Sequence, residues 1–203
     1  MTKIDLRKKM LEQRRALSVE EWRMKSDRIS QILSDDPEFR SAKTVLAYFS
    51  TRQEPDLSNL WSNLWSNLWS NLWTDPEPTI QDQTFGFPLC EDNNLVWRQW
   101  RPNDPLRVGK FGIQEPSREA DIILPEEADL MLVPCVGCDC VGYRCGYGGG
   151  FYDRLFAKPE WRSVRTIGIV FDFAVVEKMT VDPWDQPLDR ICTDQGFLSL
   201  KTN

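Results

Sequence analysis

Histidine is absent from this chain of 203 residues. Its absence removes the commonest general base, the usual partner of a nucleophilic serine, and the commonest zinc ligand. Any chemistry must therefore come from carboxylates, Lys and Arg, Cys, Tyr or a bound cofactor. The chain also lacks an apolar run near the roughly 18 residues of a membrane span, so we expect no membrane partner.

An excess of positive charge is missing as well. Lys and Arg number 25 against 31 Asp and Glu, which gives a net charge of −6. Proteins that bind nucleic acid normally present a basic face, so we expect no nucleic-acid partner. The first residues, MTKIDLRKKM, lack the apolar core of a signal peptide, and we expect a cytoplasmic protein. The length predicts one domain over residues 1–203, and we expect a monomer.

Cysteine is present, but its spacing is not that of a zinc site. The run CVGCDCVGYRC lacks two separated CxxC pairs, so a metal-binding module is the weaker interpretation. Reduced cysteines in a cytosolic protein are more often small apolar core residues, which is the interpretation we favour. The six are Cys90, Cys135, Cys138, Cys140, Cys145 and Cys192.

Short apolar strands interleaved with helices predict an α/β fold with a largely parallel, Rossmann-like sheet. Ser18 and Glu21 form a capping box that predicts a helix running to about Leu33, and Pro37 closes it. Another helix is expected over residues 3–15, and one starting at Phe151. Strands are expected at residues 43–50, 84–89, 95–100, 129–133 and 166–171.

Residues 58–73 repeat the unit SNLW four times. In a helix, four residues turn about 400°, so the Leu-Trp stripe would wind around the helix axis by roughly 40° per unit. We interpret the repeat as an inserted extension between two strands that the fold tolerates. An aromatic ridge that binds a partner or a membrane surface is the alternative, which the lack of basic residues weakens.

The segment VGYRCGYGGGFYDR at residues 141–154 contains five glycines. Glycine at this density lets backbone N–H groups converge on an anion. The segment lacks the Lys-Ser/Thr ending of a P-loop and the GxGxxG spacing of a dinucleotide fold. Neither standard phosphate motif fits, so the rest of the chain has to decide what this loop holds.

Charged residues elsewhere have two interpretations each. Lys3 and Arg7 lie four residues apart on one helix face. They form either a solvated basic face or part of a shared site. Glu54 follows a strand, where open α/β sheets bind ligands. Asp153 at a helix start is either a cap or an Mg²⁺ ligand. Asp185 either holds a metal or shapes a proline-bounded turn.

The order of these segments resembles the 5-formyltetrahydrofolate cyclo-ligase family, also called methenyltetrahydrofolate synthetase. The matching segments are KxxxR with RRALS, YFS…E, FGIQEP, DLMLVP, GYRCGYGGGFYDR and WDQPLD. They extend from Lys3 to about Thr193, and the glycine-rich segment is the most specific of them. The resemblance implies a three-layer α/β/α sandwich.

The resemblance also implies a reaction. The family converts 5-formyltetrahydrofolate to 5,10-methenyltetrahydrofolate with ATP and Mg²⁺, releasing ADP and phosphate. The formyl oxygen is a poor leaving group, and its phosphorylation gives an electrophile that N10 of the same folate attacks. Such a reaction depends on positioning and charge neutralisation, so it needs no histidine.

The resemblance assigns roles to residues of this chain. Arg144 and Tyr152 correspond to catalytic positions, and Asp153 and Asp185 to Mg²⁺ positions. The folate positions correspond to Phe49, Glu54, Tyr147, Gly148, Gly149, Gly150 and Phe151. The ATP positions correspond to Lys3, Arg7, Arg144, Gly146, Tyr147, Gly148, Gly149, Gly150, Phe151 and Tyr152.

The chain departs from the family pattern at a few positions. Cys138, Cys140 and Cys145 stand where the family has Phe, a polar residue and Leu, and Trp184 stands where histidine is common. These changes leave the implied ligands in place. The alternative function is a non-catalytic nucleotide-binding or regulatory protein on the same scaffold.

Overall fold

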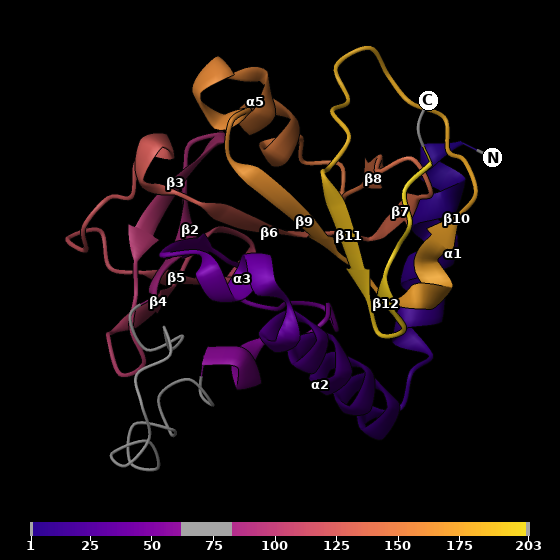
Figure 1. Ribbon diagram of the computed structural model, residues 1–203, viewed down its shortest axis with the longest axis horizontal. Helices are drawn as coiled ribbons and strands as arrows, with labels where there is room; N and C mark the ends of the chain where they lie inside the picture. The colour runs from indigo at the N-terminus through magenta and orange to yellow at the C-terminus, as the bar shows by residue number, and fades with distance from the viewer. Residues whose placement is uncertain (1, 62–82, 202–203) are drawn as a thin grey trace.

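A seven-stranded mixed sheet runs through the centre of the computed structural model, which describes residues 2–61 and 83–201 (Figure 1). Its strand order is β12-β11-β9-β6-β1-β2-β3. All pairings from β2 across to β11 are parallel, and only the edge strands β3 and β12 run antiparallel. The strands are β1 Thr44–Leu46, β2 Thr84–Glu91, β3 Asn94–Gln99, β6 Leu130–Pro134, β9 Arg165–Ile169, β11 Arg190–Thr193 and β12 Gly196–Phe197.

Helices cover both faces of this sheet. α1 (Lys3–Arg15) and α5 (Phe151–Ala157) bury Leu6, Met10, Leu155 and Phe156 in one hydrophobic cluster. On the opposite face, α2 (Val19–Asp35), α3 (Pro37–Ser41) and the helical residues 58–61 build a second cluster. Figure 1 shows α2 and α3 next to each other, with α1 apart from them beside β7, β8 and β10. The result is the expected three-layer α/β/α sandwich.

Smaller elements decorate the main sheet. β10 (Val175–Val176), β7 (Gly137–Asp139) and β8 (Arg144–Cys145) form a second sheet, and β4 (Leu106–Val108) pairs with β5 (Gln114–Pro116). Single 3₁₀ turns lie at Lys110–Gly112, Pro125–Glu127, Pro159–Trp161 and Asp172–Ala174. Strands of two or three residues contain too few positions for an alternating pattern, so the sequence did not predict them.

The predicted elements exist, with some changes of length. The capping box at Ser18 and Glu21 is present, and α2 ends two residues beyond Leu33 at Asp35. Pro37 does more than close that helix, because it also opens α3, with Asp36 as its N-cap. The expected strand at residues 43–50 was too long: β1 ends at Leu46. The residues that follow leave the sheet and lead into the cavity described below.

Strand order fixes where a ligand can enter. The strand that follows β1 in sequence, β2, pairs on one side of it, whereas β6 pairs on the other side. Open α/β sheets bind ligands in the crevice at the carboxyl ends of strands where the order reverses in this way. The segments that follow β1 and β6 therefore meet at one edge of the sheet. These segments contain Glu54 and the glycine-rich loop, respectively.

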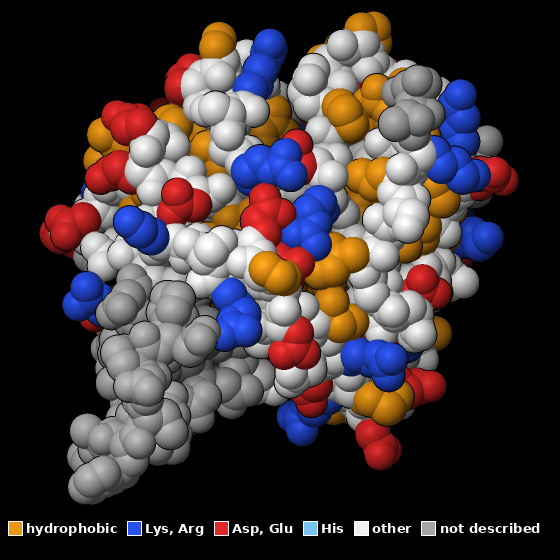
Figure 2. Space-filling view, in the orientation of Figure 1, with side chains coloured by type: hydrophobic (Ala, Val, Ile, Leu, Met, Phe, Trp, Pro, Cys, Tyr) orange, Lys and Arg blue, Asp and Glu red, His pale blue; other side chains and the backbone are white. Residues whose placement is uncertain are grey.

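On the face drawn in Figure 2, acidic and basic side chains of the described residues are interspersed. This face offers no broad basic surface of the kind that follows a nucleic-acid backbone. None of the helices in residues 2–61 and 83–201 has the length and apolar character needed to cross a bilayer.

The first SNLW unit is part of the core. Leu60 and Trp61 are buried, and the Trp61 ring packs edge-on against Phe85 and Phe87, with centroids 5.6 and 5.0 Å apart. Residues 58–61 therefore contribute to the core, and the interpretation of the repeat as an inserted extension stays a prediction. The three units at residues 62–73 lie outside the described residues.

Trp61→Ala should lower the free energy of unfolding by about 3–5 kcal/mol, the usual cost of removing a buried Trp ring. Deletion of the three units at residues 62–73 should change it by less than about 1 kcal/mol, because connection length has a weak entropic effect. Urea denaturation of the two variants checks both values. A shortened chain as unstable as Trp61→Ala would show that the later units are part of the core.

Candidate active site

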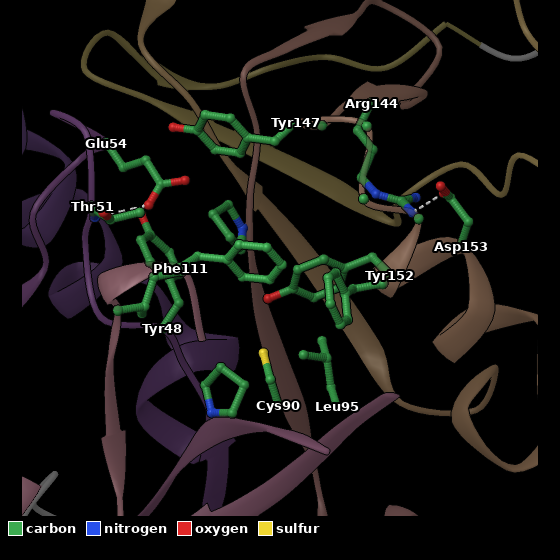
Figure 3. A pocket seen from close by; sticks show the side chains of 18 of the residues that line it. Tyr48, Thr51, Glu54, Cys90, Leu95, Phe111, Arg144, Tyr147, Tyr152 and Asp153 are labelled. Atoms are coloured by element: carbon green, nitrogen blue, oxygen red, sulfur yellow. Dashed lines mark hydrogen bonds and ion pairs between the residues drawn. The ribbon is translucent and has the colours of Figure 1, made fainter. Parts of the chain in front are cut away.

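A cavity of about 520 Å³ lies where the segments after β1 and β6 meet. Its lining comes from α1, the residues after β1, the β4–β5 hairpin, the glycine-rich loop and the start of α5. Figure 3 places Glu54 at one side of it and the Arg144–Asp153 pair at the other, with Phe111 and Tyr152 between them. The two sides differ in chemistry.

The glycine-rich loop forms one wall of the cavity. It leaves β8 at Cys145 and enters α5 at Phe151. Gly148 has φ +92°, a conformation that side chains rarely adopt, and a Cβ there would lie 3.5 Å from the Arg7 guanidinium carbon. Gly150 is left-handed at the start of α5. At both positions, glycine is favoured by the backbone conformation of the loop.

α1 brings its two basic residues to this loop. The Nε atom of Arg7 donates to the carbonyl of Gly146 at 2.6 Å. One turn earlier, the Nζ atom of Lys3 donates to Asp182 at 2.8 Å and also pairs with Asp185. Both cations line the cavity, so they do not form a solvated basic face.

Two carboxylates lie among these cations. Asp153 pairs with Arg144, and α5 has no side-chain cap, so Asp153 is not a helix cap. Asp185 pairs with Lys3 and also accepts from the backbone N–H of Asp182 at 2.6 Å, so it both faces the cavity and closes a turn. Carboxylate oxygens suit Mg²⁺, while Lys, Arg and loop amides suit phosphate. This donor set fits a metal-bound polyphosphate.

Arg144 is held on several sides. It is buried, pairs with Asp153, and donates to the carbonyl of Gln186 at 3.3 Å. Its guanidinium carbon lies 5.0 Å from the ring centroid of Phe156 and 5.9 Å from that of Tyr152. A guanidinium fixed in this way is oriented before any ligand arrives.

The other side of the cavity centres on Glu54. A tight turn from Thr51 presents it, with Arg52 and Gln53 at φ +50° and +57°. Non-glycine residues held in this region cost free energy and are frequent at functional sites. The Glu54 side chain is only 4% exposed, and it accepts from the backbone N–H of Thr51 at 3.0 Å.

Burial raises the pKa of Glu54 to about 6. The Thr51 backbone N–H, the Arg14 guanidinium, the Tyr147 hydroxyl and the Arg52 guanidinium limit that rise, in this order. At pH 7 the group is therefore a buried, ionised acceptor. It can receive two N–H donors from a planar heterocycle.

Aromatic rings flank Glu54. Phe49 stacks on Phe87 with centroids 4.1 Å apart, and Trp100 meets Phe49 edge-on at 5.2 Å. Across the cavity, Phe111 is 57% exposed and lies 6.0 Å from Phe151, also edge-on. Of these rings, Phe49, Phe111 and Phe151 line the cavity and provide flat apolar walls for a heterocycle.

The two tyrosines of the loop region stay protonated. Burial, reinforced by the charge of Glu54, raises the pKa of Tyr147 to about 12 and raises that of Tyr152 further above its ordinary value. A phenol with such a pKa donates hydrogen bonds at neutral pH and does not act as a general base. Tyr152 points into the cavity in Figure 3.

Every site residue predicted from the sequence lines this one cavity. Sequence reasoning assigned no role to a further set of lining residues. Several of them lie within the matched segments YFS, FGIQEP, DLMLVP and GYRCGYGGGFYDR, and Arg52 lies beside Glu54. The missed lining residues are Tyr48, Thr51, Arg52, Pro88, Cys90, Leu95, Phe111, Ile113, Glu115, Pro134 and Cys145.

The cysteine run is built into the packing. Cys135, Cys138 and Cys145 are buried in the cluster beneath α1. Burial raises the pKa of the Cys135 thiol to about 12 and that of Cys138 well above its ordinary value. A thiol that resists deprotonation is a poor metal ligand. This favours the packing interpretation.

Comparison with known proteins gives consistent matches. The model of the 5-formyltetrahydrofolate cyclo-ligase family matches residues 1–194. The 5-formyltetrahydrofolate cyclo-ligase of Haemophilus influenzae is 28% identical over 159 residues, covering 74% of this chain and 75% of that protein. The one from Escherichia coli K12 is 34% identical over 101 residues, covering 49% of this chain and 56% of that protein.

Solved structures agree with these matches. The NMR structure of Aquifex aeolicus 5,10-methenyltetrahydrofolate synthetase has a TM-score of 0.81 and 32% identity, covering 100% of this chain and 95% of that one. A 5,10-methenyltetrahydrofolate synthetase from Mycoplasma pneumoniae has a TM-score of 0.72 at 24% identity, covering 96% and 99%. At that identity, the second match supports the fold alone.

Glu54→Gln should stabilise the protein at neutral pH but not in acid. The folded-state pKa of about 6 lies above the ordinary value of 4.5, so the folded state binds the proton more tightly. The stability this provides is complete below pH 4.5 and is lost as pH rises through 6. The free energy of unfolding of the variant, relative to that of wild type, should therefore be about 2 kcal/mol larger at pH 7.5 than at pH 4.

Urea denaturation at the two pH values measures this gain. Glu20→Gln is the matched control, because Glu20 is exposed on α2. A difference between Glu54→Gln and wild type that does not vary with pH would contradict the raised pKa.

Proposed function

The chain belongs to the 5-formyltetrahydrofolate cyclo-ligase family, and on that premise we propose the reaction that its cavity performs. The protein is a ligase that closes the ring of 5-formyltetrahydrofolate to give 5,10-methenyltetrahydrofolate. ATP and Mg²⁺ are required, and ADP and phosphate are released. We further propose that the reaction proceeds through an intermediate in which the formyl oxygen is phosphorylated.

One observation carries this proposal. A single cavity joins a buried carboxylate between aromatic walls to a cluster of cations, carboxylates and glycine amides. The first end suits the flat, N–H-rich pterin ring of a folate, and the second suits a metal-bound polyphosphate. The reacting formyl group of a bound folate would lie between them, beside the loop that both ligands share.

At the folate end, Glu54 accepts hydrogen bonds from pterin N–H groups while Phe49 contacts the ring. This requires the ionised carboxylate, so folate binding should weaken as pH falls through about 6, the pKa of Glu54. Phe111 closes the cavity from the β4–β5 hairpin.

At the phosphate end, Lys3, Arg7 and Arg144 hold the phosphates together with the amides of the loop from Gly146 to Tyr152. Asp153 and Asp185 hold Mg²⁺, and their pairing with Arg144 and Lys3 places cation and carboxylate side by side. Bound Mg²⁺ supplies neutralisation of charge on the transferring phosphoryl oxygens.

The bond changes follow from this arrangement. The formyl oxygen takes the γ-phosphoryl group, and ADP departs. N10 then attacks the formyl carbon, a new C–N bond forms, and the formyl oxygen leaves as part of inorganic phosphate, while N10 loses its proton. Arg144 stabilises the charge that develops on the phosphoryl group, and Tyr152 donates a hydrogen bond from its neutral phenol.

The proposal is tested by mixing the purified protein with 5-formyltetrahydrofolate, ATP and Mg²⁺. Absorbance of the methenyl product should rise, and ADP should form in equal amount. Omitting any one component should abolish both signals. ATP binding without any rise in absorbance would favour the alternative, a non-catalytic nucleotide-binding protein.

Asp153→Asn should raise the Mg²⁺ concentration needed for half-maximal activity by at least about tenfold, because the amide keeps the shape but loses the charge that holds a hard cation. Asp185→Asn should behave similarly. Asp182→Asn is the matched control, since Asp182 also pairs with Lys3 but does not line the cavity. If Asp153→Asn titrates with Mg²⁺ as wild type does, Asp153 serves only to orient Arg144.

A further inference from the structure

Arg14 is a buried cation that opens the matched segment RRALS, but the resemblance gave it no role in the site. It lies in the last turn of α1 and is 1% exposed. A buried guanidinium is costly unless its donors are satisfied. Among the described residues, it forms no ion pair with a carboxylate. An ion pair therefore does not explain why this guanidinium is buried.

The hydrogen bonds of Arg14 go to the two segments that form the cavity. One terminal nitrogen donates to the hydroxyl of Tyr147 at 2.8 Å, and the other donates to the carbonyl of Cys135 at 2.7 Å. Tyr147 belongs to the glycine-rich loop, whereas Cys135 directly follows β6. The planar fork of one side chain thus fixes the loop to the end of the strand.

Tyr147 in turn reaches the folate side of the cavity. The Arg52 guanidinium carbon lies 5.4 Å from its ring centroid, and Arg52 belongs to the turn that presents Glu54. Because the phenol oxygen accepts from Arg14, its own hydrogen is left to donate toward Glu54. A chain of contacts therefore leads from α1 through the loop to the carboxylate.

We propose that Arg14 is a positioning residue for folate binding, which it supports by holding Tyr147 against Glu54. This inference rests on the proposed function, in which Glu54 accepts hydrogen bonds from the pterin. Arg14 does not touch the substrate. It fixes the direction of the Tyr147 hydroxyl and supplies a buried positive charge, from outside the Glu54 turn, that favours the ionised form of Glu54.

Because few cations surround Glu54, Arg14 should affect the pH dependence of folate binding. The groups facing Glu54 are Arg14 from α1, Arg52 from its own turn, Tyr147 from the loop, Tyr48 from the segment after β1 and Tyr152 from α5. Only two of them are cations. Removing Arg14 therefore leaves Glu54 harder to ionise, because burial still raises its pKa.

The test compares Arg14→Met, which keeps the length of the side chain without charge, with Arg14→Lys and Tyr147→Phe. Steady-state kinetics are measured from pH 5.5 to 9. For Arg14→Met, we expect the KM for 5-formyltetrahydrofolate to rise about tenfold at pH 7 and the acid limb of kcat/KM to move up by about one pH unit. The KM for ATP should change less than threefold.

The other variants separate charge from geometry. Arg14→Lys should restore the position of the acid limb but only part of the KM, because an ammonium cannot make both hydrogen bonds in the same fork. Tyr147→Phe should raise the KM for folate, and adding Arg14→Met to it should cost less than the two changes do separately. Arg15→Met is the matched control, because Arg15 is the exposed neighbour on the same helix.

A purely structural role for Arg14 predicts a different result. Arg14→Met would then lower the free energy of unfolding while leaving the acid limb and the KM for folate at their wild-type values, and this result would overturn the proposal. Binding of 5-formyltetrahydrofolate, followed by quenching of tryptophan fluorescence over the same pH range, gives the acid limb without turnover. Wild-type protein that binds folate without turnover would refute the proposed function but leave the Arg14 inference open to the same comparison.

Discussion

The parallel pairing of β1 with a neighbour on each side is the constraint on which the site depends. Val45 of β1 lies opposite Phe85 of β2 on one side and Leu130 of β6 on the other. The chain segments that follow β1 and β6 are therefore connected to opposite sides of the sheet. A crevice opens where the chain diverges, at the carboxyl ends of the strands. Glu54 and the glycine-rich loop come together there, although about ninety residues separate them in the sequence. α1 then closes the crevice by packing on the loop.

The site carries more buried charge than stability alone favours. Glu54 is ionised at pH 7 despite a surrounding that raises its pKa to about 6. Arg144 and Asp185 are satisfied by single opposite charges, and Arg52 and Gln53 hold an uncommon backbone conformation. Each of these features has a free-energy cost that the two hydrophobic clusters must offset. Such a concentration of cost in one cavity is typical of a catalytic site.

Local signals in the sequence predicted the fold class, whereas most of the candidate site residues were assigned through the resemblance to a family. Alternating helices and apolar strands fixed the α/β class, and the glycine-rich segment marked one wall by its composition. Glu54 could be located because it follows a strand end. Phe111 and Arg14 could not be assigned from such signals. Phe111 reaches the cavity only because β4 and β5 pair, and Arg14 only because α1 packs over Cys135. Contacts of this kind depend on tertiary packing, which no local pattern encodes.

The SNLW repeat is a second feature whose packing its local sequence pattern did not predict. A stripe that drifts around a helix predicted an extension without a core role, yet Trp61 packs on Phe87, which stacks on Phe49 in the cavity. The first unit therefore supports Phe49 in the cavity wall through a single intervening ring, Phe87. Because all four units have the same sequence, the loss of one places an identical Leu-Trp pair after Asp56 and Leu57. The core contact at residues 58–61 should thus not depend on the number of units. A repeat of this kind is therefore compatible with a nearby site, although only Phe87 lies between Trp61 and Phe49.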